Sequence, residues 1–486
     1  MQTVDRVAPG TGVRDASVAS GQTGTQPANR SFAQSLSREW LAIGAADTDV
    51  RSFAALCAVF AAVLWGQLVR GAFFRLDLTV FTSFAVFGAV VMPHARAAVR
   101  TPWLIASAGS MALAVGVSAI ARDQLGAALC PLAAIAAASS LAVVGICASQ
   151  RTERLLFGRV VVDAAVVTGV LCIVGVALHV PAFAELQAEG WRASARIGYA
   201  NATGVVLVTG LLCACWLAYE SGALGDRLRA WAIMTGLLAT QSRGAVLGLA
   251  ICWLLYLVVH RASARILAQT TAWALVAFVG LIPAIERSHA QPVYALCGIG
   301  LALILLIITS TGMSARSVQL IAVSVGWSAA VTTVVLLNTR VADSGSDSGR
   351  LRLWHEALGH LSATGVFGAG PSQLASFSNG RINQLFDHND LLQYGQYYGV
   401  LGVLAVALTV AWLAVAFTRT RRVVMAGMWV LGVAAVVSLA CDAMVDFPMQ
   451  VPLIPATVGL VLGLTLGRGR GVDATADLHH REGNAL

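Results

Sequence analysis

Long apolar runs separated by short polar segments follow one another from about residue 50 to residue 467. Runs of about 20 apolar residues match the ~30 Å hydrocarbon thickness of a bilayer when they are helical. Continuous apolar runs favour helices over the alternating strands of a membrane barrel. We therefore predict an all-α fold, a polytopic membrane protein with about 12–14 transmembrane helices. The predicted spans lie near 53–69, 77–93, 103–121, 125–148, 160–180, 202–219, 230–242, 244–259, 266–285, 293–310, 317–337, 391–417, 423–441 and 451–467.

The apolar stretch 230–259 sets the direction of every span after it. Its residues would cover roughly 45 Å as one helix, which is too long for one crossing and short for two. Cytoplasmic loops are enriched in arginine, and a hairpin with Arg243 at its outer turn places Arg261, Arg265, Arg316 and the arginines of 419–422 on the inner side. A single helix would place them outside. The arginine bias therefore predicts the hairpin, with both tails in the cytoplasm.

This topology divides the chain into five parts. Residues 1–50 and 468–486 are rich in small and polar residues without periodicity, which predicts disordered cytoplasmic tails. Residues 51–337 form the N-terminal transmembrane helices and residues 391–467 the C-terminal ones. Residues 338–390 become one large extracytoplasmic loop, which carries most of the polar residues of interest.

Composition narrows the chemistry. The chain is 57% hydrophobic and 12% charged, and its formal net charge of +8 is explained by arginine in cytoplasmic loops, so that nucleic acid is not an expected partner. Its 9 cysteines lie in or beside apolar runs and form no CxxC or Cys/His cluster. We therefore expect no structural metal and no cofactor.

Three polar stretches share the predicted outer face: "RIGYANATG" before residue 205, "TQSRGA" around Arg243, and the long loop that ends in "FDHNDLLQ". Arg243 suits phosphate oxygens because its guanidinium offers a fork of donors, but interfacial snorkelling would also place an arginine there. His388 precedes a predicted helix, so it is either a reactive imidazole or part of a helix cap. Arg350 and Arg352 fit a solvated loop helix equally well.

Taken together, these elements resemble the O-antigen ligase and O-antigen polymerase superfamily of bacterial membrane glycosyltransferases. The resemblance rests on six elements in the same order over roughly residues 196–460. These are "GYANA" (198–202), "TQSRGA" (240–245), R-x-x-x-W (350–354), the glycine turn "GAGP" (368–371), "HND" with "LQ" and Gly399 (388–399), and "VDFPMQ" followed by Pro452 (445–452).

The resemblance implies transfer of a glycan from a polyprenyl-diphosphate carrier to an acceptor hydroxyl at the outer side of the cytoplasmic membrane, without metal or cofactor. It implies His388 as catalytic base and Arg243 and Arg350 as diphosphate-binding residues. Supporting roles fall to Asp387, Asn389, Asp390, Asn201, Arg352 and Arg381. Asp387 or Asp390 is the expected partner that orients the His388 ring. The implied partners are the lipid-linked donor, membrane lipid, and a glycan, lipid or protein acceptor.

The same motifs serve ligases, polymerases and protein oligosaccharyltransferases, so the acceptor stays open. A polytopic transporter or flippase of lipid-linked glycans is the alternative function. Such a protein is expected to place polar residues at the bilayer midplane, often within repeated halves, whereas here they gather at one predicted face and no repeat is evident.

Overall fold

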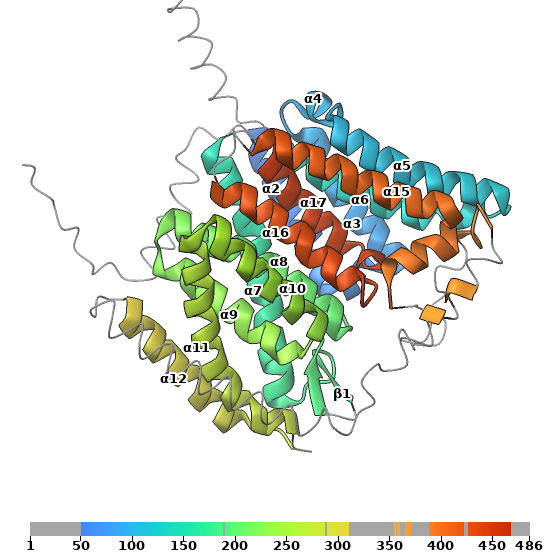
Figure 1. Ribbon diagram of the computed structural model, residues 1–486. Helices are drawn as coiled ribbons and strands as arrows, with labels where there is room; N and C mark the ends of the chain where they lie inside the picture. Colours follow the sequence, from blue (N-terminus) through green and yellow to red (C-terminus); the bar gives the residue numbers. More distant parts are fainter. Residues whose placement is uncertain are drawn as a thin grey trace, which may run out of the picture. The chain divides into compact units, whose positions relative to one another are not determined.

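The computed structural model describes residues 50–148, 150–187, 190–286, 289–310, 354–355, 357–359, 365–371, 388–421 and 426–467. Helices dominate this part of the chain (Figure 1). They are α2 (Val50–Leu68), η1 (Arg70–Ala72), α3 (Arg75–Val91), α4 (Ala95–Val99), α5 (Pro102–Ala121), α6 (Leu125–Cys147), α7 (Arg151–Leu178), α8 (Ala200–Ser221), α9 (Leu224–Thr240), α10 (Arg243–Val259), α11 (Arg261–Glu286), α12 (Pro292–Ser310), α15 (Asp390–Thr420), α16 (Ala426–Ala443), η4 (Pro448–Gln450) and α17 (Leu453–Leu466).

Most of these helices have the length and composition of membrane spans. Within the described residues, 9 helices are long and apolar enough to cross a bilayer, and α10 and α17 are shorter apolar helices. Each predicted span coincides with a helix except 317–337, which lies outside the described residues, as do residues 1–49 and 468–486 and most of 338–390. The predicted class, a polytopic helical membrane protein, is confirmed.

The stretch 230–259 is two helices, as predicted, but the first begins earlier. The chain turns at Gln241, whose φ is 52°, and Ser242 caps α10 through its side chain. α9 starts at Leu224 because the charges in its first turns are paired: Arg229 lies 2.8 Å from Asp163 and 3.0 Å from Asp226. Each helix has 17 residues, or about 25 Å, which is at the lower limit of length for one crossing.

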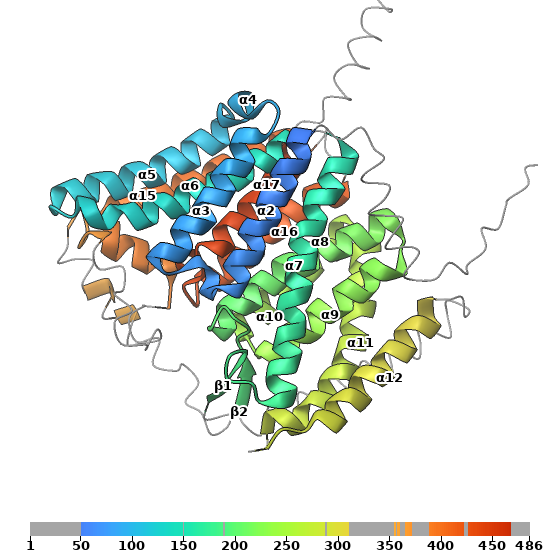
Figure 2. The same ribbon diagram turned by 180° about the vertical axis from the view of Figure 1, so that it is seen from behind.

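α8 lies at the centre of the helices, and α12 lies at their periphery. The most apolar window of α8 is 94% buried, whereas that of α12 is 17% buried. α6 and α17 pack side by side through glycines (Figures 1 and 2). A Cβ on Gly459 would lie 2.7 Å from the carbonyl oxygen of Ala138, so only glycine permits this approach. Small residues that bring backbones close drive helix association in membranes.

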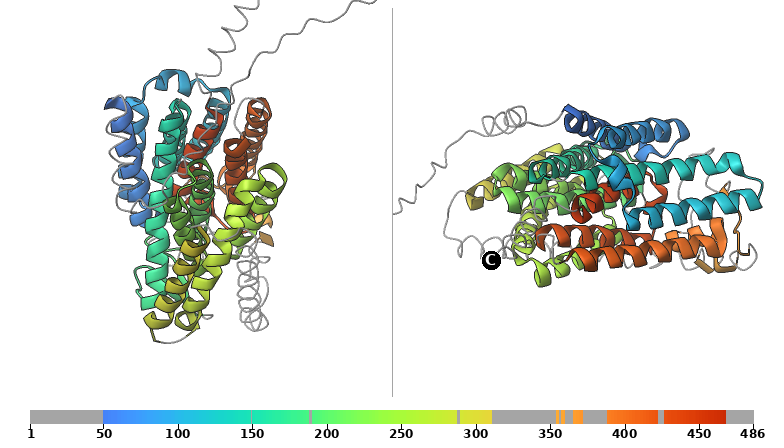
Figure 3. Two further views of the ribbon diagram at one scale, coloured as in Figure 1. Left: turned by 90° about the vertical axis from the view of Figure 1, so that its left-hand side faces the viewer. Right: turned by 90° about the horizontal axis from the view of Figure 1, so that it is seen from above.

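α15 bends at Gly399 and runs along α5, which is visible from above in Figure 3. The backbone of Gly399 has φ 63° and ψ −149°, outside the helical region. The predicted turn at 368–371 lies against this bend, where Ala369 N donates to Gln396 O (2.7 Å) and Gly370 N donates to Tyr397 O (2.9 Å). The "GAGP" turn therefore supplies the donors that the interrupted helix lacks for its carbonyl groups.

A two-stranded antiparallel hairpin follows α7, where we predicted only loop. β1 (Ala184–Gln187) pairs with β2 (Gly190–Ala193), and Glu185 faces Arg192. Gln241 Nε2 donates to Trp191 O (2.9 Å), so the hairpin holds the turn between α9 and α10. Strands this short give a weak periodic signal, and the apolar runs on either side mask it.

Candidate functional site

The carboxylate of Asp446 joins segments from three parts of the chain. It lies between α16 and η4 and accepts hydrogen bonds from Tyr199 Oη (2.9 and 2.7 Å), from the amide of Asn201 and from the backbone of Phe447 (2.9 Å). Tyr199 and Asn201 belong to the "GYANA" element at the start of α8. The late "VDFPMQ" element is therefore bonded to an element about half a chain away.

His388 is the fourth partner of this carboxylate. Its Nδ1 lies 3.1 Å from Asp446 Oδ1, and the two side chains are 12% and 2% exposed. The backbone of His388 has φ 50°, a left-handed conformation that turns the chain immediately before α15. Its ring also packs against Phe447, with centroids 5.3 Å apart. The imidazole is thus held by a carboxylate through one nitrogen, Nδ1, and this contact fixes the orientation of the ring.

The helix cap at this position belongs to Asn389. Its side chain accepts from Leu392 N (3.1 Å) and donates to Met444 O (2.9 Å), so it both begins α15 and ties it to the segment before Asp446. The sequence allowed His388 to be either a reactive imidazole or part of the helix cap. In the structure Asn389 is the cap residue of α15. The capping geometry places the imidazole directly against Asp446.

Of the two carboxylates expected to orient the His388 ring, Asp390 makes its hydrogen bonds to other groups. Asp390 accepts from Met449 N (2.8 Å) and from Gln450 Nε2 (3.1 Å), so it secures η4. This occurs because Asp390 is already in the first turn of α15 and projects away from the residue that precedes the cap. Asp387 lies outside the described residues. The His388 ring pairs with Asp446.

Arg192 connects the hairpin to the other two elements. Its guanidinium donates to Thr240 O (3.1 Å), to Asn201 Oδ1 (3.0 Å) and to Gln187 Oε1 (2.9 Å). Asn201 can then present its amide nitrogen to Asp446, because Arg192 occupies its oxygen. Burial raises the pKa of Glu185, the cross-strand neighbour, and Arg192 partly opposes this rise.

Glycines and serine bring the "TQSRGA" turn against the same cluster. A Cβ on Gly204 would lie 2.9 Å from Ser242 Cβ, and one on Gly244 would collide with the carboxylate of Asp442. These two glycines are therefore required by close packing of α8, α10 and α16. Arg243, the first residue of α10, is exposed and its side chain makes no hydrogen bond or ion pair with any described residue. It is available to an anion at this end of the helices.

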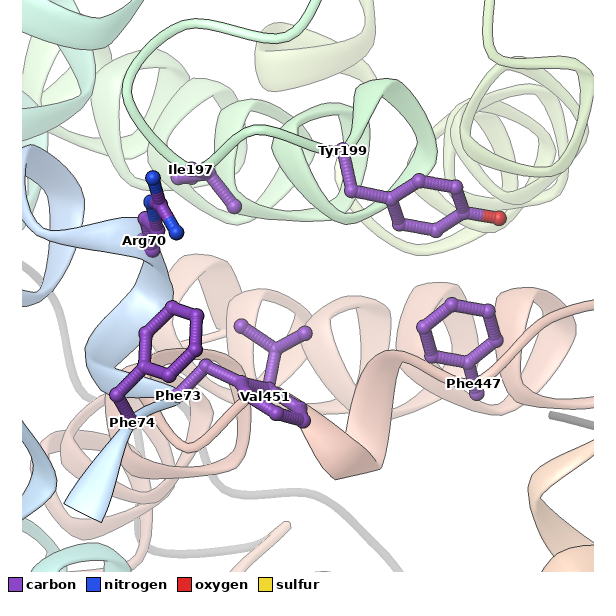
Figure 4. A pocket seen from close by; sticks show the side chains of 7 residues that line it. All are labelled: Arg70, Phe73, Phe74, Ile197, Tyr199, Phe447 and Val451. Carbon is purple, nitrogen blue, oxygen red and sulfur yellow. The ribbon is translucent and has the colours of Figure 1, made fainter. Parts of the chain in front are cut away.

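A small pocket opens beside this cluster (Figure 4). Apolar and aromatic side chains form its walls: Phe73, Phe74, Ile197, Tyr199, Phe447 and Val451. Arg70 supplies its charged group. The rings of Tyr199 and Phe447 are stacked, with centroids 4.9 Å apart, and separate the pocket from Asp446.

The structure thus brings together His388, Asn201, Asn389 and Asp390 among the residues expected from sequence, while Arg243 is exposed next to Gly244, which lies against Asp442. Arg350, Arg352 and Arg381 lie outside the described residues. Asp446, Tyr199 and Arg192 were not assigned roles, although the first two stand inside elements that the resemblance had marked. Among the described residues no group of three or more His, Cys, Asp or Glu side chains has the arrangement of a metal site.

Comparison with known proteins gives no match, either to a protein-family model or to a curated protein.

Proposed function

We propose that this chain is a membrane glycosyltransferase that moves a glycan from a polyprenyl-diphosphate carrier to an acceptor hydroxyl at the extracytoplasmic face of the cytoplasmic membrane. The observation that carries the proposal is the His388–Asp446 pair, bonded to Tyr199 and Asn201 at the end of the helices where Arg243 is exposed. A general base and an exposed arginine at the same end of the helices suit transfer from a phosphate leaving group. The sequence resemblance supports the same reaction.

In the proposed reaction the acceptor oxygen attacks the anomeric carbon of the donor glycan. The bond between that carbon and the diphosphate oxygen breaks, and the electron pair leaves with polyprenyl diphosphate. His388 Nε2 takes the hydroxyl proton, and Asp446 stabilises the imidazolium that results. Arg243 binds charge on the leaving diphosphate, together with Arg350 from the loop. The direct test is glycan transfer by purified protein in lipid vesicles, compared with empty vesicles.

The alternative, a transporter or flippase, makes a different prediction in that assay. It would move lipid-linked glycan across the bilayer without forming a new glycosidic bond. Movement of the donor with no transferred product would overturn the glycosyltransferase proposal. Formation of product in detergent, where no second compartment exists, would support it.

Arg243→Ala is expected to weaken donor binding and also to slow transfer, because the diphosphate is charged in both the ground state and the transition state. Loss of one charge-assisted contact corresponds to about 1.5–3 kcal/mol, or roughly 10–100-fold. Arg243→Lys should recover only part of this, because an ammonium lacks the fork of donors. A titration of lipid-linked donor measures both effects. Arg196→Ala, which removes an exposed arginine at the same end, is the control, and an equal loss there would contradict a specific role.

The proposed topology predicts that the site faces outward. A cysteine replacing Leu186, an exposed residue of β1, should react with an impermeant thiol reagent in intact cells. A cysteine replacing Thr418, near the end of α15, should react only after the cells are opened. The exposed Cys57 and Cys297 are removed first. The reverse pattern would place the site in the cytoplasm and rule out the proposed reaction.

Metal independence is also expected, because arginine side chains are proposed to bind the leaving group. Transfer by purified protein should therefore keep its rate in excess EDTA. Loss of transfer on chelation, with recovery on adding Mg²⁺ or Mn²⁺, would contradict the arginine mechanism.

A further inference from the structure

Arg192 lies in β2 of the hairpin, and its guanidinium contacts three separate segments (Figure 2). Its Nε donates to Thr240 O (3.1 Å), its Nη1 to Gln187 Oε1 (2.9 Å) and its Nη2 to Asn201 Oδ1 (3.0 Å). Because the guanidinium is planar and rigid, the bonds of Nε and Nη1 set the direction of Nη2. The hairpin and the turn between α9 and α10 therefore aim one charged donor at the amide oxygen of Asn201.

The amide of Asn201 has one orientation that suits both of its ends. Its nitrogen donates to Asp446 and to Tyr199 Oη (3.1 Å). The Tyr199 hydroxyl itself donates to Asp446 (2.7 Å), and a carboxylate can only accept. A flipped amide would turn its oxygen toward the carboxylate, so Asn201 needs a donor on its far side. Arg192 is that donor.

These bonds form a chain from Arg192 through Asn201 and Asp446 to His388. The amide nitrogen of Asn201 holds Asp446 Oδ2, and the other oxygen, Oδ1, lies 3.1 Å from His388 Nδ1. A cation at the oxygen end of an amide strengthens donation by its nitrogen, because bonds in such a chain polarise one another. The direction in which Asp446 presents its free oxygen to the imidazole thus depends on Asn201, and the place of Asn201 depends on Arg192.

We propose that Arg192 is a positioning residue for the His388–Asp446 pair, which acts by holding the amide of Asn201 toward Asp446. The assignment rests on the proposed function, because it takes His388 as the base. Arg192 acts through the amide and contacts neither donor nor acceptor. The competing explanation is that Arg192 only fastens the hairpin to the helices. Loss of that fastening would lower stability and leave the transfer rate per folded molecule unchanged.

The test begins with Arg192→Met, which keeps an apolar stem and removes the donors. Single-turnover glycan transfer at saturating donor is measured with the full-length protein in phosphatidylcholine vesicles. The rate should fall by roughly 10–100-fold, the effect of losing one charge-assisted hydrogen bond. The donor KM should stay near the wild-type value, because Gln241 Nε2 still donates to Trp191 O and holds the turn before Arg243. Arg192→Lys should be faster than Arg192→Met, since an ammonium can still donate to Asn201.

The sharpest comparison repeats Arg192→Met on an Asn201→Leu background. Asn201→Leu removes both the acceptor of Arg192 and the donor to Asp446. If Arg192 acts through this amide, the double variant should be no slower than Asn201→Leu alone. Losses that multiply would show that Arg192 acts by another route and would overturn the assignment.

Arg196→Met is the matched control. Arg196 is an exposed arginine four positions further along, and its Nε donates to Leu68 O (3.3 Å). Its replacement should leave the rate near that of the wild type. Size-exclusion profiles and thermal unfolding give the folded fraction of each variant. If Arg192→Met does not fold, Arg192→Lys takes its place and should be slower than the wild type only where Asn201 is present.

Failure of this assignment is distinguishable from failure of the proposed function. A wild-type rate of folded Arg192→Met, together with an inactive His388→Ala protein, removes the role of Arg192 and leaves the glycosyltransferase. Full transfer activity of His388→Ala removes the proposed reaction whatever the Arg192 variants do.

Discussion

His388→Ala is expected to slow glycan transfer by about 10²–10⁴-fold, the contribution that a positioned general base usually makes. This corresponds to roughly 3–5 kcal/mol of activation free energy. Binding of the lipid-linked donor should hardly change, since the imidazole is proposed to act on the acceptor. The protein should insert and fold, because Asn389 supplies the cap of α15 independently of His388. Single-turnover transfer at saturating donor measures the effect.

The control for this variant is His179→Ala. His179 follows the end of α7, where it stacks on Trp191 and its Nε2 lies 2.7 Å from Ala284 O. Its replacement tests the general consequence of removing an imidazole near the hairpin, and transfer should fall far less than in His388→Ala. If the His388→Ala protein transfers glycan at nearly the wild-type rate, His388 is not the catalytic base and has only a structural role before the helix cap.

The fold was predictable because the bilayer imposes a length on each apolar run. Helices as different as α5 and α17 could be located this way, and the arginine bias separated α9 from α10. The predicted first residues of the helices were less accurate than the predicted number of helices along each stretch. α9 begins at Leu224 because ion pairs of Arg229 with Asp163 and Asp226 stabilise a charged first turn, and a hydropathy pattern contains no information about which charges will meet.

Local motifs predicted the members of the candidate site better than their partners. "HND" and "GYANA" marked residues that the structure brings together, yet the carboxylate at their centre was expected among the neighbours of His388 in sequence. Asp446 is 58 positions from His388 and 247 from Tyr199. Only the packing of α16 against α8 and α10 brings it there, and no spacing within one segment could have indicated that.

In the "SRGA" element, too, the sequence did not reveal which residues pack together in the fold. We predicted that its arginine binds phosphate. The sequence did not show why the next residue, Gly244, has to be a glycine. Gly244 lies against Asp442, so the turn is pressed onto α16, four residues before Asp446. The position of Arg243 near the cluster thus depends on a residue without a reactive group.

The second large effect is expected for Asp446→Asn. The change preserves the size of the side chain but removes the charge that would stabilise a protonated His388. It also replaces a carboxylate oxygen by an amide that must donate, although Tyr199, Asn201 and Phe447 N all donate to this site. We expect transfer to fall by about 10²–10⁴-fold, because an altered partner leaves the imidazole in the wrong tautomer or orientation.

The variant is also expected to lose about 1–3 kcal/mol of stability, since buried donors lose a partner. Asp226→Asn is the matched control, because Asp226 is another buried carboxylate that accepts from an arginine and a serine, in the first turn of α9. It should destabilise the protein with little change in the rate per folded molecule.

The decisive comparison is the double variant of Asp446→Asn with His388→Ala. If Asp446 acts through the imidazole, the double variant should be no slower than His388→Ala alone. Losses that multiply would mean that Asp446 contributes independently of His388 and would refute the pairing proposed for catalysis.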